Sequence, residues 1–293
     1  MDAAALIARA RRLRFRVRRG AMADLVGAYQ GSRAGSGLLF AELRPYEPGD
    51  EVRHLDWNAS ARQGRPFVRK FAEERALTVW LVVDVSASLR FGPEGATKAD
   101  RAVQAAALLA TAAVRAGDRA GLVLVSDRVE AELPPGVGPR HLARLIRTLV
   151  VTPSRSRRTA LAKGLAGPSR SRRRALVIVL GDFLAAEPAA DWEAATRRHD
   201  VVAIRIVEPR EERLPPAGLL DVADAETGAA RVVDSGSSRV RDAYARAAEE
   251  RARAFRAWCG ACGVVGLELS TADDPLTALL RFFSARARRR GRP

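Results

Sequence analysis

The chain has few cysteines and histidines, and this shortage excludes several kinds of site. Its 293 residues include 2 cysteines and 3 histidines. Cys259 and Cys262 form a C-G-A-C pair, but a zinc site would need further ligands, and no histidine is suitably spaced. The pair also follows a helical pattern, whereas a redox pair opens a helix after a strand. We therefore expect two reduced cysteines near the end of a helix.

Long hydrophobic runs are absent as well. A membrane-spanning helix needs roughly 18 consecutive apolar residues, and the longest weakly polar stretch, residues 102–114, is shorter and rich in alanine. At the start of the chain the charges follow the apolar patch, and no cleavage pattern of a signal peptide is present. These absences predict a soluble protein of the cytoplasm.

Aromatic residues and lysine are also scarce. Aromatics make up 5% of the chain and hydrophobic residues 47%, so the core must rest mainly on Val, Leu, Ile and Ala. Only Lys70, Lys98 and Lys163 are lysines among the 50 basic residues, and the net charge is +16. Attraction to nucleic acid, anionic lipid or an acidic partner stays open. Solvated faces of an arginine-rich proteome are the simpler interpretation.

The chain divides into two parts. Residues 1–75 combine a basic helix over 1–28 with a segment rich in Gly and charge, where short strands are expected at 38–43 and 66–71. Residues 76–293 form the second part, with a hairpin insertion at about 208–236. Its pattern alternates strands at 78–84, 119–126, 174–180, 200–207 and 264–269 with helices at 97–116, 141–150, 189–198, 238–258 and 275–290, and a further helix begins at 159.

This alternation predicts the fold class. Apolar runs such as TVWLVV and ALVIVL suit strands that are buried on both faces of a parallel sheet. Strands that alternate with helices indicate a doubly wound, Rossmann-like α/β fold with a mostly parallel sheet. The Gly-rich segment before it would be a small β-containing appendage.

Oxygen-bearing side chains follow two of these strands. Asp84, Ser86 and Ser88 form a D-x-S-x-S loop after the first buried strand, and Asp182 follows the third. Thr159 opens a helix after an Arg/Ser loop. Parallel strands share their carboxyl ends, where ligands bind in such sheets, so we expect these five residues to converge. Carboxylates and hydroxyls suit Mg²⁺ or Mn²⁺, and one open position would accept an Asp or Glu of a partner.

This pattern resembles the metal-ion-dependent adhesion site (MIDAS) of von Willebrand factor A (vWA) domains. A narrower resemblance covers nearly the whole chain, because residues 42–62 are similar to the signature of the domain of unknown function 58 family. Residues 207–215 and 224–228 resemble further segments of that family. One departure is Gly181, where members commonly have Ser before the third-loop Asp, and its absence would loosen a supporting hydrogen bond.

The resemblance implies a function. The family is associated with MoxR-type AAA+ ATPases, so an adaptor or co-chaperone role beside such an ATPase, or toward its substrate, is expected. Many members carry amino-terminal membrane helices, and their absence here favours a cytosolic form. The metal would then bind a partner protein, and the chain would not be an enzyme.

The signature segment allows two interpretations. Its prominent residues could dock a partner, or they could form ion pairs beside a buried tryptophan that join a small subdomain to its neighbour. We favour the structural interpretation. The residues concerned are Tyr46, Asp50, Arg53, Asp56, Trp57 and Arg62.

Two rival functions stay open. A Mg²⁺-dependent phosphoryl-transfer enzyme could use Asp84 as the acceptor, but a second carboxylate is expected two residues later, where Ser86 stands, and no lysine is well placed by sequence. A nucleic-acid-binding protein would explain the charge. It is not favoured, because no zinc-finger, RNA-recognition or helix-turn-helix signature is present.

Overall fold

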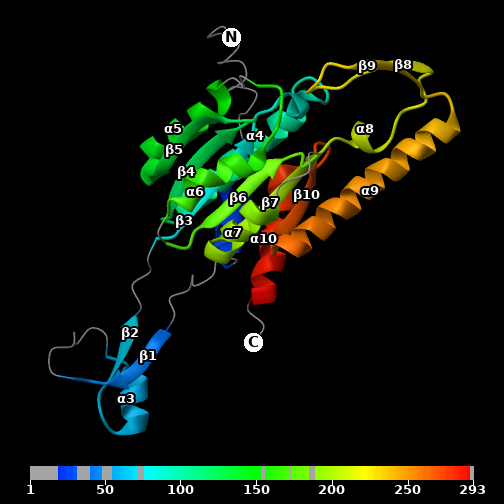
Figure 1. Ribbon diagram of the computed structural model, residues 1–293. Coiled ribbons are helices and arrows are strands. Elements are labelled where there is room, and N and C mark those ends of the chain that lie inside the picture. Colours follow the sequence, from blue (N-terminus) through cyan, green and yellow to red (C-terminus); the bar gives the residue numbers. More distant parts are fainter. Residues whose placement is uncertain are drawn as a thin grey trace.

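The computed structural model describes residues 19–31, 40–47, 55–71, 76–152, 156–171, 173–184 and 189–290. Its centre is a six-stranded sheet of order β10-β7-β6-β3-β4-β5 (Figure 1). Only β5 pairs antiparallel, and it lies at one edge. The strands are β3 (Thr78–Asp84), β4 (Arg119–Val125), β5 (Val129–Gly136), β6 (Leu176–Gly181), β7 (Asp200–Val207) and β10 (Val265–Ser270).

The central strands form because their apolar runs are buried on both faces. All six residues of β6 are buried, as are the last six of β3. The register pairs Val83 with both Leu124 and Leu180, so β3, β4 and β6 end at the same edge of the sheet. The side chains that follow these strands are thereby brought to one place.

Helices cover both faces of the sheet, and this confirms the doubly wound fold. One core cluster joins the sheet to α4 (Lys98–Arg115), α5 (Gly138–Val151), α2 (Arg19–Gly31) and α10 (Pro275–Arg290). The other joins it to η3 (Leu161–Leu165), α7 (Ala189–Arg198) and α9 (Ser238–Cys262). The short α6 (Ala166–Ser169) follows η3. The predicted helix at Thr159 is therefore wrong in type, since the chain forms a 3-10 turn that begins at Leu161.

Part of the amino-terminal segment packs on the sheet body. In α2, Leu25 and Tyr29 are fully buried. The rings of Tyr29 and Phe283 meet edge-on with centroids 5.9 Å apart, and the Tyr29 hydroxyl donates to Asp118 Oδ2 at 2.7 Å. Residues 1–18 of the helix predicted over 1–28 lie outside the described residues. The predicted division of the chain into two parts at residue 76 stays a prediction. The helix α2, which precedes that residue, shares a hydrophobic core with the sheet.

A small unit lies apart from the sheet in Figure 1. It consists of the antiparallel pair β1 (Phe40–Pro45) and β2 (Phe67–Phe71), with α3 (Trp57–Gln63) between them. The two strands lie close to the ranges predicted for them. An arm formed by β8 (Leu219–Ala223) and β9 (Ala230–Asp234) follows the short α8 (Pro209–Glu212). This arm is the predicted hairpin.

The cysteines lie at the end of α9, as expected. Both are free and buried, and Gly263 ends the helix with a φ of 68°. Burial, together with the neighbouring Cys262 and Glu268, raises the pKa of Cys259 to about 11. Such a thiol is a poor nucleophile at neutral pH. No helix in the described part of the chain is both long and apolar enough for a membrane span.

Candidate metal centre

The candidate site lies where the strand order reverses. From β3 the chain proceeds to β4 and β5 on one side, and it then returns to β6, β7 and β10 on the other. Open α/β sheets bind ligands at such a switch point, beyond the carboxyl ends of the strands. Asp84 ends β3, and Asp182 directly follows the neighbouring β6.

The loop after β3 gathers a carboxylate and two hydroxyls. The Ser86 amide donates to Asp84 Oδ1 at 2.8 Å, and the hydroxyl oxygens of Ser86 and Ser88 lie 3.0 Å apart. The exposed fractions of Asp84, Ser86 and Ser88 are 1%, 1% and 8%. Three hard oxygen donors are therefore buried together at the start of η2 (Ala87–Arg90).

Asp84 lacks a counter-charge of its own. Its Oδ2 atom is buried and has no hydrogen-bond partner among the residues that the structure describes. Burial and the adjacent Asp182 raise the pKa of Asp84 to about 8, against the opposing effects of Ser86 and Lys98. A buried carboxylate is costly unless it is protonated or paired. The donor set and the orphaned oxygen therefore fit a hard divalent cation.

Asp182 differs from Asp84 because a lysine balances it. Its Oδ2 accepts from Lys98 Nζ at 3.1 Å, and Lys98 Nζ also donates to Glu211 Oε1 at 2.7 Å. Lys98 is fully buried in the first turn of α4. Lys98 thus lies beside the candidate site, although the sequence analysis assigned it no role there. Glu211 belongs to α8, within residues 207–215, which the family resemblance had singled out without a role.

The turn after β6 is held by an unusual backbone conformation. Phe183 has a φ of 51°, which is uncommon for a residue other than glycine. Its ring packs against Trp192, Phe255 and Trp258, with centroids 5.2–6.0 Å away. The Leu184 amide then donates to Asp182 Oδ1 at 3.3 Å. Aromatic packing thus offsets the strain and fixes the carboxylate.

Gly181 lies directly against Asp84. A Cβ atom at this position would be 3.3 Å from Asp84 Oδ2 and 3.0 Å from the Leu161 Cδ1 methyl. The missing serine would therefore stand beside the orphaned oxygen. The loss of a supporting contact at Gly181 stays a prediction.

Thr159 reaches the same edge through its loop. The Ala160 amide donates to Ser126 O at 2.9 Å, and the Ala87 amide donates to Arg157 O at 3.3 Å. The loop that carries Thr159 is therefore hydrogen-bonded both to the residue after β4 and to the loop of Ser86 and Ser88. The Thr159 hydroxyl donates to Glu226 Oε1, at 2.9 Å, on the tip of the β8–β9 arm. The structure thus brings all three predicted loops to one edge of the sheet.

This arrangement is not a cluster of acidic and imidazole ligands. Among the described residues, no three His, Cys, Asp or Glu side chains lie close enough together to hold a metal ion by themselves. A cation here would depend on two carboxylates and on hydroxyls. Such a set suits Mg²⁺, which commonly keeps several of its water ligands.

The signature residues that the structure describes form no comparable site. Asp56 caps α3 by accepting from the Ala59 amide at 3.0 Å, and the Tyr46 amide donates to Pro66 O at 2.9 Å. Trp57 is 71% exposed, so the interpretation with a buried tryptophan is wrong. Arg62 is exposed as well, whereas Asp50 and Arg53 lie outside the described residues.

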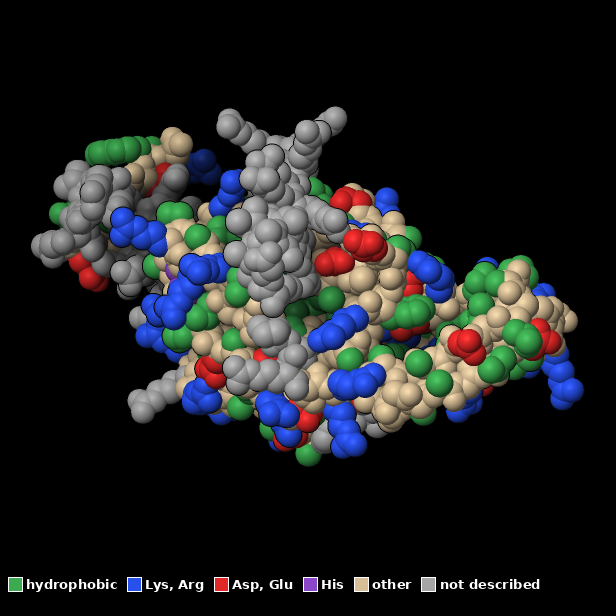
Figure 2. Space-filling view, turned by 90° about the horizontal axis from the view of Figure 1, so that it is seen from above, with side chains coloured by type: hydrophobic (Ala, Val, Ile, Leu, Met, Phe, Trp, Pro, Cys, Tyr) green, Lys and Arg blue, Asp and Glu red, His purple; other side chains and the backbone are tan. Residues whose placement is uncertain are grey.

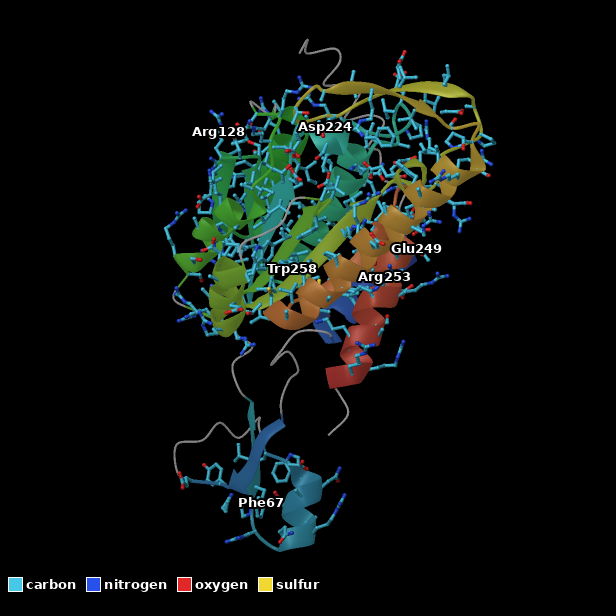
Figure 3. All side chains as sticks on the ribbon, turned by 45° about the vertical axis from the view of Figure 1, so that its right-hand side comes forward. Phe67, Arg128, Asp224, Glu249, Arg253 and Trp258 are labelled. Atoms are coloured by element: carbon cyan, nitrogen blue, oxygen red, sulfur yellow. The ribbon has the colours of Figure 1, made fainter. Side chains whose placement is uncertain are left out.

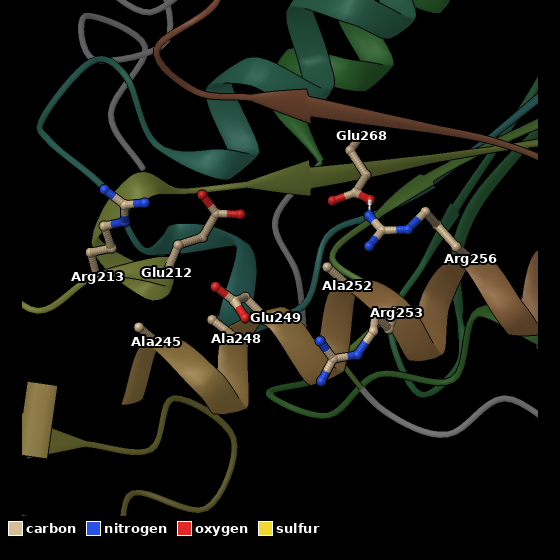
Figure 4. Close-up of a pocket in the computed structure, with 9 residues that line it drawn as sticks. All are labelled: Glu212, Arg213, Ala245, Ala248, Glu249, Ala252, Arg253, Arg256 and Glu268. Atoms are coloured by element: carbon tan, nitrogen blue, oxygen red, sulfur yellow. Dashed lines mark hydrogen bonds and ion pairs between the residues drawn. The ribbon is translucent and has the colours of Figure 1, made fainter. Parts of the chain in front are cut away.

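A groove of about 420 Å³ lies beside α9, and Glu268 in its lining is paired with two arginines (Figure 4). Arg256 Nη1 donates to Glu268 Oε1 at 2.8 Å, and Arg205 Nη1 donates to Glu268 Oε2 at 3.0 Å. Alanines form part of its wall. Its lining residues are Glu212, Arg213, Ala245, Ala248, Glu249, Ala252, Arg253, Arg256 and Glu268.

Relatives of this chain can be identified over most of its length. A family model described as Protein of unknown function DUF58 matches residues 42–254. Uncharacterized protein Rv1480 of Mycobacterium tuberculosis is 34% identical over 298 residues, which cover 98% of this chain and 92% of that protein. Uncharacterized protein YeaD of Bacillus subtilis is 26% identical over 111 residues, which cover 38% of this chain and 26% of that protein.

Solved structures with a similar fold include BatB from Bacteroides thetaiotaomicron. It has a TM-score of 0.47 at 16% identity, and the match covers 73% of this chain and all (100%) of that chain. The vWA domain of SpRpn10 gives a TM-score of 0.36 at 10% identity, over 71% of this chain and 95% of that one. The mostly parallel sheet with helices on both faces is the doubly wound α/β fold that the sequence predicted.

Proposed function

On the premise that this chain belongs to the DUF58 family, we propose that it is a protein-interaction module that captures an acidic side chain of its partner through a divalent cation. The observation that carries this proposal is the buried, unpartnered Oδ2 atom of Asp84 beside Asp182. Desolvation of two neighbouring carboxylates is offset only in part by Lys98. A cation would offset the remainder.

The residues that would hold the cation come from three loops. Mg²⁺ or Mn²⁺ would supply the positive charge to which the partner's carboxylate binds. Asp84 and Asp182 would provide charge, and the hydroxyls would bind directly or through water. The set comprises Asp84, Ser86, Ser88, Thr159 and Asp182.

The surroundings of the site favour an acidic partner. Arg90, Arg128, Arg157 and Arg158 are exposed on the loops at this edge of the sheet. Phe91 and Leu184, each within three residues of a site residue, are 44% and 46% exposed. Positive charge at a rim attracts an acidic partner and speeds the encounter, and exposed apolar side chains can anchor it.

In the part of the face in Figure 2 that grey atoms do not cover, basic side chains are interspersed with acidic and apolar ones. An extended nucleic-acid footprint is expected to be uniformly basic. This distribution supports a protein partner over nucleic acid. The partner we propose is a MoxR-type AAA+ ATPase or its substrate, in the cytoplasm, and this identity rests on the family association alone.

The position of Lys98 supports a binding role over phosphoryl transfer. A phosphoryl-transfer site would need a lysine that reaches the substrate, but Lys98 is fully buried and engages Asp182 and Glu211. We therefore propose a binding role without catalysis. Release of phosphate from generic substrates in the presence of Mg²⁺ would contradict it.

Thermal melting with added metal tests the proposal. The variant Asp84→Asn keeps the shape of the side chain and removes its charge, and Asp242→Asn on the exposed face of α9 is the matched control. At a metal concentration a hundredfold above Kd, stabilisation is about 2.7 kcal/mol, or roughly 5 to 10 °C. We expect this shift in the wild type and the control but not in Asp84→Asn. Equal shifts in all three proteins would refute the proposed site.

A further inference from the structure

The tip of the β8–β9 arm is docked on the candidate metal centre. Besides the bond from Thr159 to Glu226, Arg157 Nε donates to Ala225 O at 2.9 Å. The two contacts join the tip to the loop that carries Thr159. The carbonyl oxygen of Arg157, in that same loop, also accepts a hydrogen bond from the Ala87 amide, which lies between Ser86 and Ser88. An acidic side chain of the chain itself therefore contacts Thr159, a residue of the proposed ligand set.

The tip is built to present Glu226. Asp224 Oδ1 accepts from the amides of Glu226 and Thr227 at 2.9 and 2.7 Å. The Gly228 amide donates to Asp224 O at 2.8 Å, and Gly228 has a φ of 76°, which glycine adopts without strain. These bonds fix the backbone on both sides of Glu226. Figure 3 shows Asp224 at the same end of the molecule as Arg128, which lies in the turn after β4.

The two strands of the arm, between its base and its tip, are mostly exposed to solvent. Leu219 and Val232 are 74% and 63% exposed. The arm is tied at its base, where the Ser235 hydroxyl donates to Gly218 O at 2.8 Å and accepts from the Ala217 amide at 3.0 Å. Attachment at the base and the tip, with exposed strands between them, suits an arm whose tip can be released.

We propose that Glu226 is an internal ligand of the metal centre, and that a partner's acidic side chain must displace it. This inference rests on the proposed function, because it requires the cation. Glu226 already accepts a hydrogen bond from a residue of the ligand set, and its carboxylate has the chemistry that we assign to the partner. The arm therefore closes the site when no partner is bound. Displacement lowers the partner's apparent affinity by the fraction of molecules that are open.

Hydrogen exchange at the arm tip tests this inference. Mg²⁺ should bind the Glu226 carboxylate and slow exchange of the amides of residues 225–229 at least fivefold relative to EDTA. The variant Glu226→Gln keeps an acceptor for the Thr159 hydroxyl but loses the charge that binds a cation, so this Mg²⁺-dependent protection should disappear. Asp221→Asn removes a charge from the exposed β8 strand of the same arm, and it should behave as the wild type does.

Melting curves of the same samples separate the two proposals. If Mg²⁺ raises the melting temperature of the wild type without slowing exchange at the tip, Glu226 is not a ligand and the metal centre stands. Protection that persists in Glu226→Gln would also overturn the internal ligand. If Mg²⁺ changes neither quantity, the proposed function fails and this inference fails with it.

Discussion

The sheet edge and the small β1–β2–α3 unit carry the two sets of residues that the sequence marked for binding. The two sets differ in how much free energy their burial costs. At the sheet edge, Asp84, Lys98 and Asp182 are ionisable groups with at most 2% exposure. In the small unit, Trp57 is 71% exposed and Arg62 is also exposed. Burial of charge costs free energy, so it persists only where folding or function requires it. Exposure of the second set carries no such cost.

The two carboxylates at the sheet edge differ in the same way. Asp182 has a buried ammonium group and a backbone amide as partners, whereas one oxygen of Asp84 has no partner among the described residues. A site that merely stabilised the fold would be expected to pair both carboxylates. On the proposed function, the cation would supply the positive charge that Asp84 lacks.

Removal of the Lys98 ammonium group should lower the free energy of unfolding the most. Lys98→Met leaves Asp182 and Glu211 without their shared counter-charge, so we expect a loss of about 3–5 kcal/mol in the free energy of unfolding, measured with urea. Lys163→Met, at an exposed lysine, should cost less than about 1 kcal/mol. Mg²⁺ should restore part of the stability lost in Lys98→Met. Equal losses in the two variants would mean that the buried charges are not coupled.

The pH dependence of stability should report Asp84 in metal-free protein. Its pKa is raised from 3.8 to about 8 in the folded state, so the folded protein holds a proton that the unfolded chain releases. The resulting stabilisation is complete below about pH 4 and is lost as the pH rises through 8. Urea unfolding in EDTA should show this decline for the wild type and a flatter profile for Asp84→Asn. Saturating Mg²⁺ should remove the decline, and parallel profiles in EDTA would contradict the shifted pKa.

Local patterns in the sequence were enough to predict most of the fold. The apolar runs of β3 and β6 are continuous, that of β7 is interrupted only by Arg205, and the predicted bounds of α10, residues 275–290, agree with the structure. The strand β5 was missed because Pro134 and Pro135 indicate a turn. Proline is tolerated there because β5 lies at the edge of the sheet.

The site was only partly predictable, because some of its contacts join distant parts of the chain. The residues at the ends of β3 and β6 follow from the shared edge of parallel strands. Lys98 lies 84 residues from Asp182 and 113 from Glu211, and Glu226 lies 67 residues from Thr159. No local periodicity encodes such pairs. The only signal was the resemblance of residues 207–215 and 224–228 to family segments, which marked both acids without a role.

The smallest effect is expected in the small unit, and it tests whether the two regions are independent. Trp57→Ala removes an exposed side chain, so the free energy of unfolding should change by less than about 0.5 kcal/mol. Trp192→Ala, at a fully buried tryptophan, should cost about 3–5 kcal/mol. The Mg²⁺-dependent melting shift should be the same in Trp57→Ala and in the wild type, because Trp57 belongs to α3, which lies apart from the sheet in Figure 1. A reduced shift would show that the small unit closes over the metal centre. The contrast between buried ionisable groups at the sheet edge and freely exposed side chains in the small unit would then no longer hold.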